Sequence, residues 1–195
     1  MEKFFSERVK EYCVTLNEVF NKSDFNKSEK LMHKIYECSI NGKHVFICGN
    51  GGSAANAIHM ANDFVCGIAK DGIGSLKATA LPANQSIITC IANDIGYEKI
   101  FSSQLEILAS AGDILIVLSG SGNSKNILNA VETAKEIGLK TFAIVGFDGG
   151  KVASMVDTAV HFKINDMEIA EDLQMVLGHN IVRSIKRNYK ANAAL

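Results

Sequence analysis

Short apolar runs that end in glycine or serine and lead directly into helical patterns constrain the fold of this chain most strongly. Three of them read as buried strands: "HVFICG" at 44–49, "DILIVLS" at 113–119 and "KTFAIVG" at 140–146. A strand that is apolar on both faces is typical of a parallel sheet covered by helices on both sides. The sequence therefore predicts an α/β fold, with a doubly wound parallel sheet of about five strands flanked by helices.

Weaker patterns complete this organisation. Residues 77–82 and 158–164 are further strand candidates, and a long helix is predicted from about 167 to 190. Apolar residues at helical spacing over 4–20 and 28–40 predict an N-terminal helical hairpin, which Asn41 and Gly42 end. No linker interrupts the 195 residues. We therefore expect one domain, 1–195, with the hairpin over 1–42 and the α/β body over 43–195.

Composition and charge exclude several classes of protein. The formal net charge of −1 provides no basic face for nucleic acid. No run approaches the roughly 18 apolar residues of a membrane helix, and the charged N-terminus has no signal-peptide core. We expect a cytoplasmic protein that binds neither nucleic acid nor membrane. The five cysteines lack CxxC spacing and are predicted to be reduced, mostly as core residues: Cys13, Cys38, Cys48, Cys66 and Cys90.

Two serine-glycine loops, "CGNGGSAAN" at 48–56 and "LSGSGNSKN" at 118–126, follow predicted strands and precede predicted helices. Ligands of open α/β sheets bind at this edge, where helix N-termini offer unpaired N–H groups to phosphate. The second loop predicts a phosphate cradle of three serines around two glycines: Ser119, Ser121, Ser124, Gly120 and Gly122. The alternative is that Asn123 or Ser124 only caps the following helix. A cap needs one such residue, which favours the phosphate site.

The first loop formally matches the dinucleotide pattern G-x-G-x-x-A from Gly49 to Ala54. That pattern also needs an acidic residue at the end of the second strand, and Asp71 stands in a loop instead. Asn50 and Ser53 suit a hydroxylated ligand at least as well. Asn93 and Asp94 form a further polar pair, which a helix C-terminus explains almost equally well.

Two predicted helices each carry an imidazole and a carboxylate. His59 and Asp63, four residues apart, share a helix face, while Glu171 and His179 are eight residues apart. Such nitrogen and oxygen ligands suit a divalent ion such as zinc. Eight residues correspond to about 12 Å of helix rise. Glu171 and His179 must therefore reach toward each other or serve sites in different subunits.

Five ordered motifs resemble the SIS (sugar isomerase) family, and within it the phosphoheptose isomerases: "GNGGSAANAIHMANDF", "IANDIGYEKIF", "LSGSGNSKN", "VGFDGGK" and "LGHNIV". The resemblance covers nearly the whole chain. It implies a five-stranded SIS fold and a homotetramer with active sites between subunits. It also implies conversion of sedoheptulose 7-phosphate to a D-glycero-D-manno-heptose 7-phosphate-type aldose, for capsule or lipopolysaccharide.

The resemblance implies a role for each matching residue. Substrate contacts fall on Asn50, Gly51, Gly52, Ser53, Asn93, Asp94, Ser119, Gly120, Ser121, Ser124 and Glu171. Metal ligands fall on His59, Asp63, Glu171 and His179, and catalytic roles on Asp63, Glu171 and His179. One zinc or other divalent ion per site is implied, with no nucleotide cofactor. The chain departs from the family pattern three times: Gly120 replaces threonine, Asp63 replaces glutamate and Glu171 replaces glutamine.

Three functions remain open at this point. The first is an aldose–ketose isomerase in which one of Asp63, Glu171 and His179 carries the proton. The second is a non-catalytic SIS module that binds sugar phosphate and acts through protein contacts, which the altered carboxylates keep open. The third, a nicotinamide-dependent oxidoreductase, rests only on the glycine pattern of the first loop.

Overall fold

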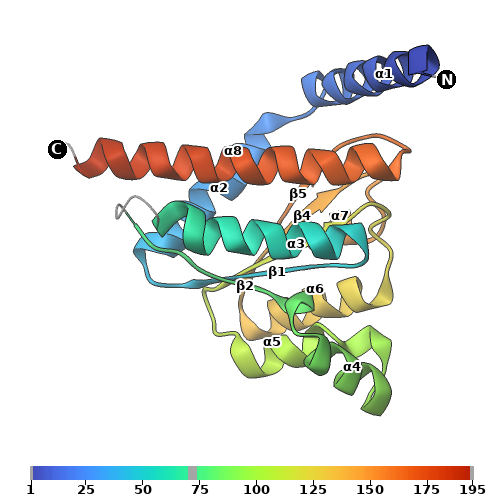
Figure 1. Ribbon diagram of the computed structural model, residues 1–195. Helices are drawn as coiled ribbons and strands as arrows, with labels where there is room; N and C mark the ends of the chain where they lie inside the picture. Colours follow the sequence, from blue (N-terminus) through green and yellow to red (C-terminus); the bar gives the residue numbers. More distant parts are fainter. Residues whose placement is uncertain (1, 70–73, 194–195) are drawn as a thin grey trace.

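The computed structural model describes residues 2–69 and 74–193 (Figure 1). Its helices are α1 (Glu2–Asn21), α2 (Phe25–Ile40), α3 (Gly52–Asn62), α4 (Gln85–Asp94), α5 (Ser102–Leu108), α6 (Lys125–Ile137), α7 (Val152–Met155) and α8 (Met167–Ala193). Its strands are β1 (His44–Gly49), β2 (Lys77–Ala80), β3 (Ile114–Ser119), β4 (Lys140–Val145) and β5 (Thr158–His161). These elements match the predicted order. Asp71, considered above for dinucleotide binding, lies outside the described residues.

The five strands form one parallel sheet in the order β2-β1-β3-β4-β5, which confirms the predicted fold class. From β1 the chain moves outward to β2, whereas from β3 it moves outward in the other direction to β4 and β5. The neighbouring strands β1 and β3 therefore flank the switch point of the sheet, where open α/β proteins bind their ligands. Both serine-glycine loops begin at the carboxyl ends of these two strands.

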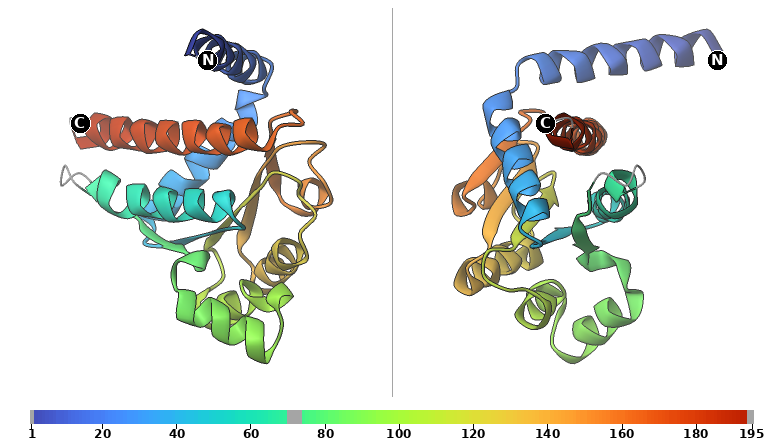
Figure 2. Two further views of the ribbon diagram at one scale, coloured as in Figure 1. Left: turned by 45° about the vertical axis from the view of Figure 1, so that its right-hand side comes forward. Right: turned by 90° about the vertical axis from the view of Figure 1, so that its left-hand side faces the viewer.

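Successive residues of the strands point alternately into two separate hydrophobic cores, as expected for a sheet covered on both faces. Val45 and Ile47 of β1 pack with α2, α3 and α8, whereas Phe46 and Cys48 pack with α5 and α6 on the opposite face. Figure 2 shows α3 and α8 lying side by side over one face of the sheet. The loop after β1 and the first turn of α8 are thereby brought to the same end of the molecule.

Both predicted N-terminal helices are present. The chain turns over 22–24, where Asp24 Oδ1 accepts a hydrogen bond from the backbone N–H of Asn26 (3.1 Å) and begins α2. The helix α1 crosses over α8 (Figure 2), to which the Tyr12 hydroxyl donates a hydrogen bond at Asp172 (2.7 Å). Burial and the Asp172 carboxylate raise the pKa of this hydroxyl. Much of the apolar face of α1 is left exposed, with Phe5 70% accessible.

All five cysteines carry free thiols, but the expectation that most are core residues is wrong. Cys38 and Cys48 are buried, and burial raises the pKa of the Cys38 thiol to about 12. Cys13, Cys66 and Cys90 are exposed. Each has apolar neighbours in the sequence, but residues adjacent in a helix point in different directions, so apolar neighbours do not imply burial. In the described ranges, no helix combines the length and apolarity that crossing a bilayer demands.

Candidate functional site

A cavity of about 270 Å³ lies at the switch point, between the loop after β1, the loop after β3 and the first turns of α8. It is lined by Asn50, Gly51, Gly52, Ser53, Leu118, Ser119, Gly120, Ser121, Ser124, Met167 and Glu171. Nine of these eleven residues are among the predicted substrate contacts. The two loops that the sequence singled out therefore share one cavity with a carboxylate from the opposite end of the chain.

The second loop presents unpartnered hydroxyl groups to this cavity. Ser119 Oγ accepts the backbone N–H of Gly122 (2.9 Å), which folds the loop back on itself. Among the described residues, the side chains of Ser121 and Ser124 have no hydrogen-bond partner. Ser124 stands at the N-cap of α6 without making a side-chain cap, so helix capping does not account for it. The loop offers hydroxyl donors together with the free N–H groups of a helix N-terminus, which suit an anion.

A tight backbone contact fixes the shape of this loop. Gly122 has a φ of +65°, and a Cβ atom there would overlap the carbonyl oxygen of Gly149 in the loop after β4. The amide of Asn123 also bridges the two loops, because its Oδ1 accepts the N–H of Lys151 (3.0 Å) and its Nδ2 donates to the carbonyl of Ser121 (3.0 Å). The loop is thereby held by its backbone, which leaves its serine side chains free.

The first loop is already occupied by a carboxylate. The carboxyl group of Glu171 lies against Gly52, the first residue of α3, and accepts a long hydrogen bond from Ser53 Oγ (3.4 Å). Gln174 donates to the same serine oxygen (3.2 Å), and Asn56 donates to the backbone carbonyl of Glu171 (2.9 Å). The partial positive charge at the N-terminus of α3 attracts the carboxylate of Glu171. The two loops therefore differ, since only the second is open to an external anion.

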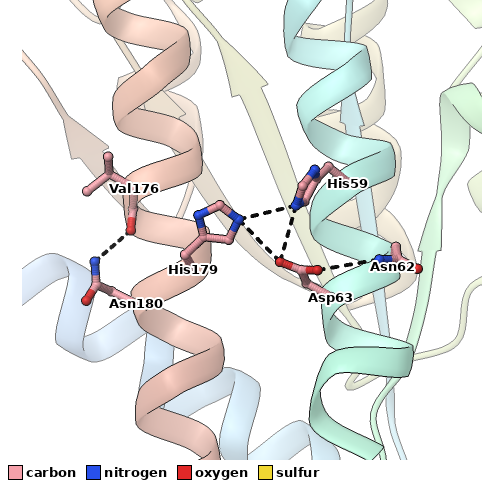
Figure 3. Close-up of polar contacts among 6 residues, drawn as sticks. All are labelled: His59, Asn62, Asp63, Val176, His179 and Asn180. Carbon is pink, nitrogen blue, oxygen red and sulfur yellow. Dashed lines mark hydrogen bonds and ion pairs between the residues drawn. The ribbon is translucent and has the colours of Figure 1, made fainter. Parts of the chain in front are cut away.

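A second cluster lies farther along the seam between α3 and α8 (Figure 3). His59 and Asp63 point from the α3 side toward His179 on α8. The Nε2 atoms of the two histidines are 3.2 Å apart, and Asp63 Oδ2 lies 3.5 Å from that of His59 and 3.4 Å from that of His179. Both imidazoles are half exposed, and the carboxylate is partly buried.

The dimensions of this cluster fit a metal ion. In tetrahedral zinc sites the ligand bonds of 2.0–2.1 Å place ligand atoms about 3.3 Å from one another. The three edges of the His59–Asp63–His179 triangle, 3.2, 3.4 and 3.5 Å, match one face of such a tetrahedron. All three atoms can offer a lone pair. The chemistry and spacing of these donors therefore suit a divalent cation.

The helix that carries His59 changes its winding at Asp63. The α-helix α3 ends at Asn62, and Asp63–Gly67 continues as a π-helical turn. The sequence predicted an uninterrupted helix here, because no residue signals the change. Turns of this kind are frequent at functional sites, where they redirect one side chain relative to the rest of the helix.

Three predicted site residues do not lie where their predicted roles would place them. Asn93 and Asp94 are exposed at the end of α4, where the Asn93 amide donates to the Asp94 carboxylate (2.7 Å), and neither lines the cavity. Glu171 lies in the cavity and is not part of the triangle of metal-ligating groups found among the described residues. The structure also adds cavity-lining residues that the sequence did not single out, Leu118 and Met167.

The structure shows what surrounds Gly120, which replaces the threonine of the family pattern. A Cβ atom on Gly120 would overlap the end of the Met167 side chain and come within 3.2 Å of the Phe147 ring. Met167 and Phe147 therefore fill the space that a side chain at position 120 would need. Phe147 itself adopts a φ of +46°, unusual for a residue with a bulky side chain. This wall of the cavity is apolar.

Comparison with known proteins agrees with the geometry. The SIS domain family matches residues 10–146. A phosphoheptose isomerase of Sulfurimonas denitrificans is 37% identical over 188 residues, which span 96% of each chain. The structure of a phosphoheptose isomerase from Neisseria gonorrhoeae covers 94% of this chain and 99% of its own at 30% identity, with a TM-score of 0.86. That of a Francisella tularensis phosphoheptose isomerase covers 96% and 99% at 26% identity, with a TM-score of 0.88. The chain therefore belongs to the SIS domain family, and within it to the phosphoheptose isomerases.

Proposed function

We propose that this protein is an aldose–ketose isomerase that converts sedoheptulose 7-phosphate to a heptose 7-phosphate of the D-glycero-D-manno type. One observation carries the proposal: the cavity at the switch point joins unpartnered serine hydroxyls at a helix N-terminus to a carboxylate held above Gly52. The hydroxyls suit the phosphate of the substrate, and the carboxylate suits the proton transfer. The relatives named above carry the same activity in their names.

The serine loop binds the phosphate group in this proposal. Ser121 and Ser124 donate hydrogen bonds to it, and the N-terminus of α6 supplies a favourable field. Binding the remote phosphate positions the reacting end of the sugar and removes much of the entropic cost of aligning it. Gly51, Gly52 and Ser53 line the opposite wall, where the sugar chain lies.

We assign the transfer of the carbon-bound proton to Glu171. Among the three predicted acid/base residues, it alone lines the cavity. Its carboxylate removes the proton from C1 of the ketose, and the electron pair forms the C1–C2 double bond of an enediol. The C2 carbonyl oxygen receives a proton as it becomes a hydroxyl. Glu171 then returns a proton to C2, while the O1 hydroxyl loses its own proton and becomes the aldehyde. Protons and electrons balance, and no redox cofactor is needed.

The remaining two predicted catalytic residues, Asp63 and His179, would hold a divalent ion together with His59. Zinc fits the mixed nitrogen and oxygen ligand set best. Such an ion supplies Lewis acidity that polarises carbonyl and hydroxyl oxygens. Asp63 faces both imidazoles, so its carboxylate would bind the ion rather than the substrate. The sequence also predicted Glu171 as a metal ligand. Its position in the cavity, outside the triangle of the other three groups, does not favour that role.

We further propose a homotetramer with active sites between subunits. Exposed apolar residues on α1 and around α4 and α5 need a partner to cover them: Phe4, Phe5, Val9, Val14, Ile95, Ile107 and Leu108. In such an assembly Asn93 and Asp94, which do not line the cavity of their own chain, would complete the site of a neighbour. The free thiols suit the reducing cytoplasm, where the product would enter capsule or lipopolysaccharide synthesis.

The proposal is tested by incubating the purified protein, loaded with zinc, with sedoheptulose 7-phosphate and following the aldehyde product by NMR. Unphosphorylated sedoheptulose serves as the control, and we expect it to turn over at least a hundredfold more slowly, because it lacks the anchoring phosphate. Binding of the phosphorylated sugar without turnover would contradict the proposal and favour the non-catalytic sugar-phosphate module.

A further inference from the structure

Three side chains that are far apart in the sequence form a closed hydrogen-bond network at the edge of the cavity. Asn50 of the first loop and Asn126 in the first turn of α6 exchange two amide hydrogen bonds, at 2.9 and 2.8 Å. The Tyr97 hydroxyl donates a third, to Asn50 Oδ1 (3.0 Å). Asn126 is 1% exposed, so its amide is committed to the interior.

The network determines which group Asn50 can still offer. A side-chain amide has two acceptor positions on oxygen and two N–H donors. Both acceptor positions of Asn50 Oδ1 are filled, by Asn126 Nδ2 and by the Tyr97 hydroxyl. One of its N–H groups is given to Asn126 Oδ1. A single N–H remains, on a residue that lines the cavity. Asn50 can therefore act only as a donor toward a ligand oxygen.

The same network joins the two substrate loops. Asn50 follows β1 directly, and Asn126 belongs to the helix whose N-terminus the serine loop forms. The reciprocal pair therefore sets the distance between the phosphate end of the cavity and the wall formed by the first loop. Tyr97 adds a third anchor from the short helical turn Tyr97–Lys99.

We propose that Asn126 and Tyr97 are positioning residues for the sugar-phosphate site. They saturate the oxygen of Asn50 and hold its one free N–H toward a substrate oxygen, and neither touches the substrate itself. The inference rests on the proposed function only in its choice of ligand, a sugar phosphate. A binding measurement judges it whether or not the protein also catalyses isomerisation.

A double-mutant cycle tests the inference. The dissociation constant of sedoheptulose 7-phosphate is measured by calorimetry for wild type, Asn126→Leu, Asn50→Ala and the double variant. We expect each single variant to bind about fivefold to tenfold more weakly, the effect of one misplaced hydrogen bond. In the Asn50→Ala background, Asn126→Leu should cause no further loss, because the group that it positions is gone.

A second pair of variants guards against general damage. Tyr97→Phe removes only a hydroxyl from a side chain that is 56% exposed, so it tests the network even if Asn126→Leu does not fold. We expect it to weaken binding about threefold in wild type and not at all with Asn50→Ala. The matched control is Gln104→Met, which removes a buried amide bonded to the carbonyls of Leu81 and Ile100, away from the cavity. Its affinity should stay within twofold of wild type.

The outcomes separate the two proposals. If wild type binds the sugar phosphate without converting it, the isomerase proposal fails, and the cycle still decides the role of Asn126 and Tyr97. If the losses from Asn126→Leu and Tyr97→Phe recur undiminished in the Asn50→Ala background, the residues do not act through Asn50 and the inference is wrong. Absence of any binding by wild type overturns both.

Discussion

The carboxyl group of Glu171 lies so close to the backbone of Gly52 that a methyl group on Gly52 would overlap both carboxylate oxygens. This contact joins the last helix to the first turn of α3 and places the carboxylate at a helix N-terminus. It explains why the first loop needs glycine at this position. In the proposed site it also gives the two loops different tasks, since only the loop after β3 remains open to the phosphate of a substrate.

Gly52→Ala should therefore impair catalysis with little effect on folding. The backbone of Gly52 is helical and accepts alanine, and the group that the new methyl would displace is the flexible end of Glu171. We expect kcat to fall about a hundredfold, the usual scale for misplacing a general base. The melting temperature should change by no more than a few degrees. Gly67→Ala is the control, because its methyl would make only ordinary contacts at 3.7 Å.

Removing the free hydroxyls of the serine loop should weaken substrate binding. Hydrogen bonds to a charged group contribute about 1.5–3 kcal/mol each, so Ser121→Ala and Ser124→Ala should each raise KM about tenfold or more. Inhibition by inorganic phosphate should weaken in parallel. Ser154→Ala, which removes a surface hydroxyl bonded to the carbonyl of Lys151, should leave both constants unchanged. Unaltered KM in both loop variants would place the phosphate elsewhere.

The His59–Asp63–His179 triangle should bind one divalent ion per chain. We expect metal analysis of the purified protein to find it, and treatment with a chelator followed by dialysis to remove it. His59→Ala and His179→Ala should lower zinc affinity at least tenfold, because each removes one of three protein ligands. His33→Ala, at an exposed histidine of α2, is the matched control. Equal zinc affinity in all three variants would show that the triangle is not a metal site.

His44 should make stability depend on pH. Burial lowers the pKa of its imidazole, an effect that the nearby Asp113 carboxylate partly opposes, and its Nε2 pairs with the Thr79 hydroxyl (2.8 Å). The unfolded chain, with a histidine pKa of about 6.5, binds the proton more readily than the folded protein. This contribution to stability is therefore present above about pH 6.5 and lost as the pH falls through the folded pKa.

Thermal unfolding at pH 7.5 and 5.5 checks this expectation. His44→Gln keeps a polar group near Thr79 but cannot titrate, so the loss of stability at pH 5.5 should be smaller than in wild type. The same substitution at exposed His33 serves as the control. If wild type and His44→Gln lose equal stability over this interval, another group is responsible for the pH dependence.

The fold could be predicted from the sequence because its signals are local. Runs such as 113–119 and 140–146 are apolar on both faces, and each is followed by a loop and a helical pattern, which together leave few alternatives to a parallel sheet. The serine loop could also be singled out from the sequence, because its glycines and hydroxyl groups follow a predicted strand directly and suit an anion without any distant partner. The π-helical turn at Asp63 was not, because nothing in its composition differs from an ordinary helix.

The arrangement of the site depends on contacts that no local pattern encodes. Asn50 and Asn126 are 76 residues apart, and Ser53 and Glu171 are 118 apart. Asn126 lies within the second serine-glycine loop motif, but the sequence alone assigned it no role, because its pairing with Asn50 could not be foreseen. The histidine and carboxylate pairs were predicted to be metal ligands from the sequence. Their division into a cavity with Glu171 and a triangle with Asp63 depends on the packing of α3 against α8, which no local pattern shows.

Isomerisation in D₂O tests the central claim most directly. Sedoheptulose 7-phosphate is incubated with wild type and with Glu171→Gln, and the aldose product is examined by NMR. We predict deuterium at C2 of the product for wild type, because the enediol takes its proton from a carboxyl group that exchanges with solvent. The rate should fall at least a hundredfold in Glu171→Gln. Product that forms equally fast in Glu171→Gln would contradict the proposed proton transfer by Glu171.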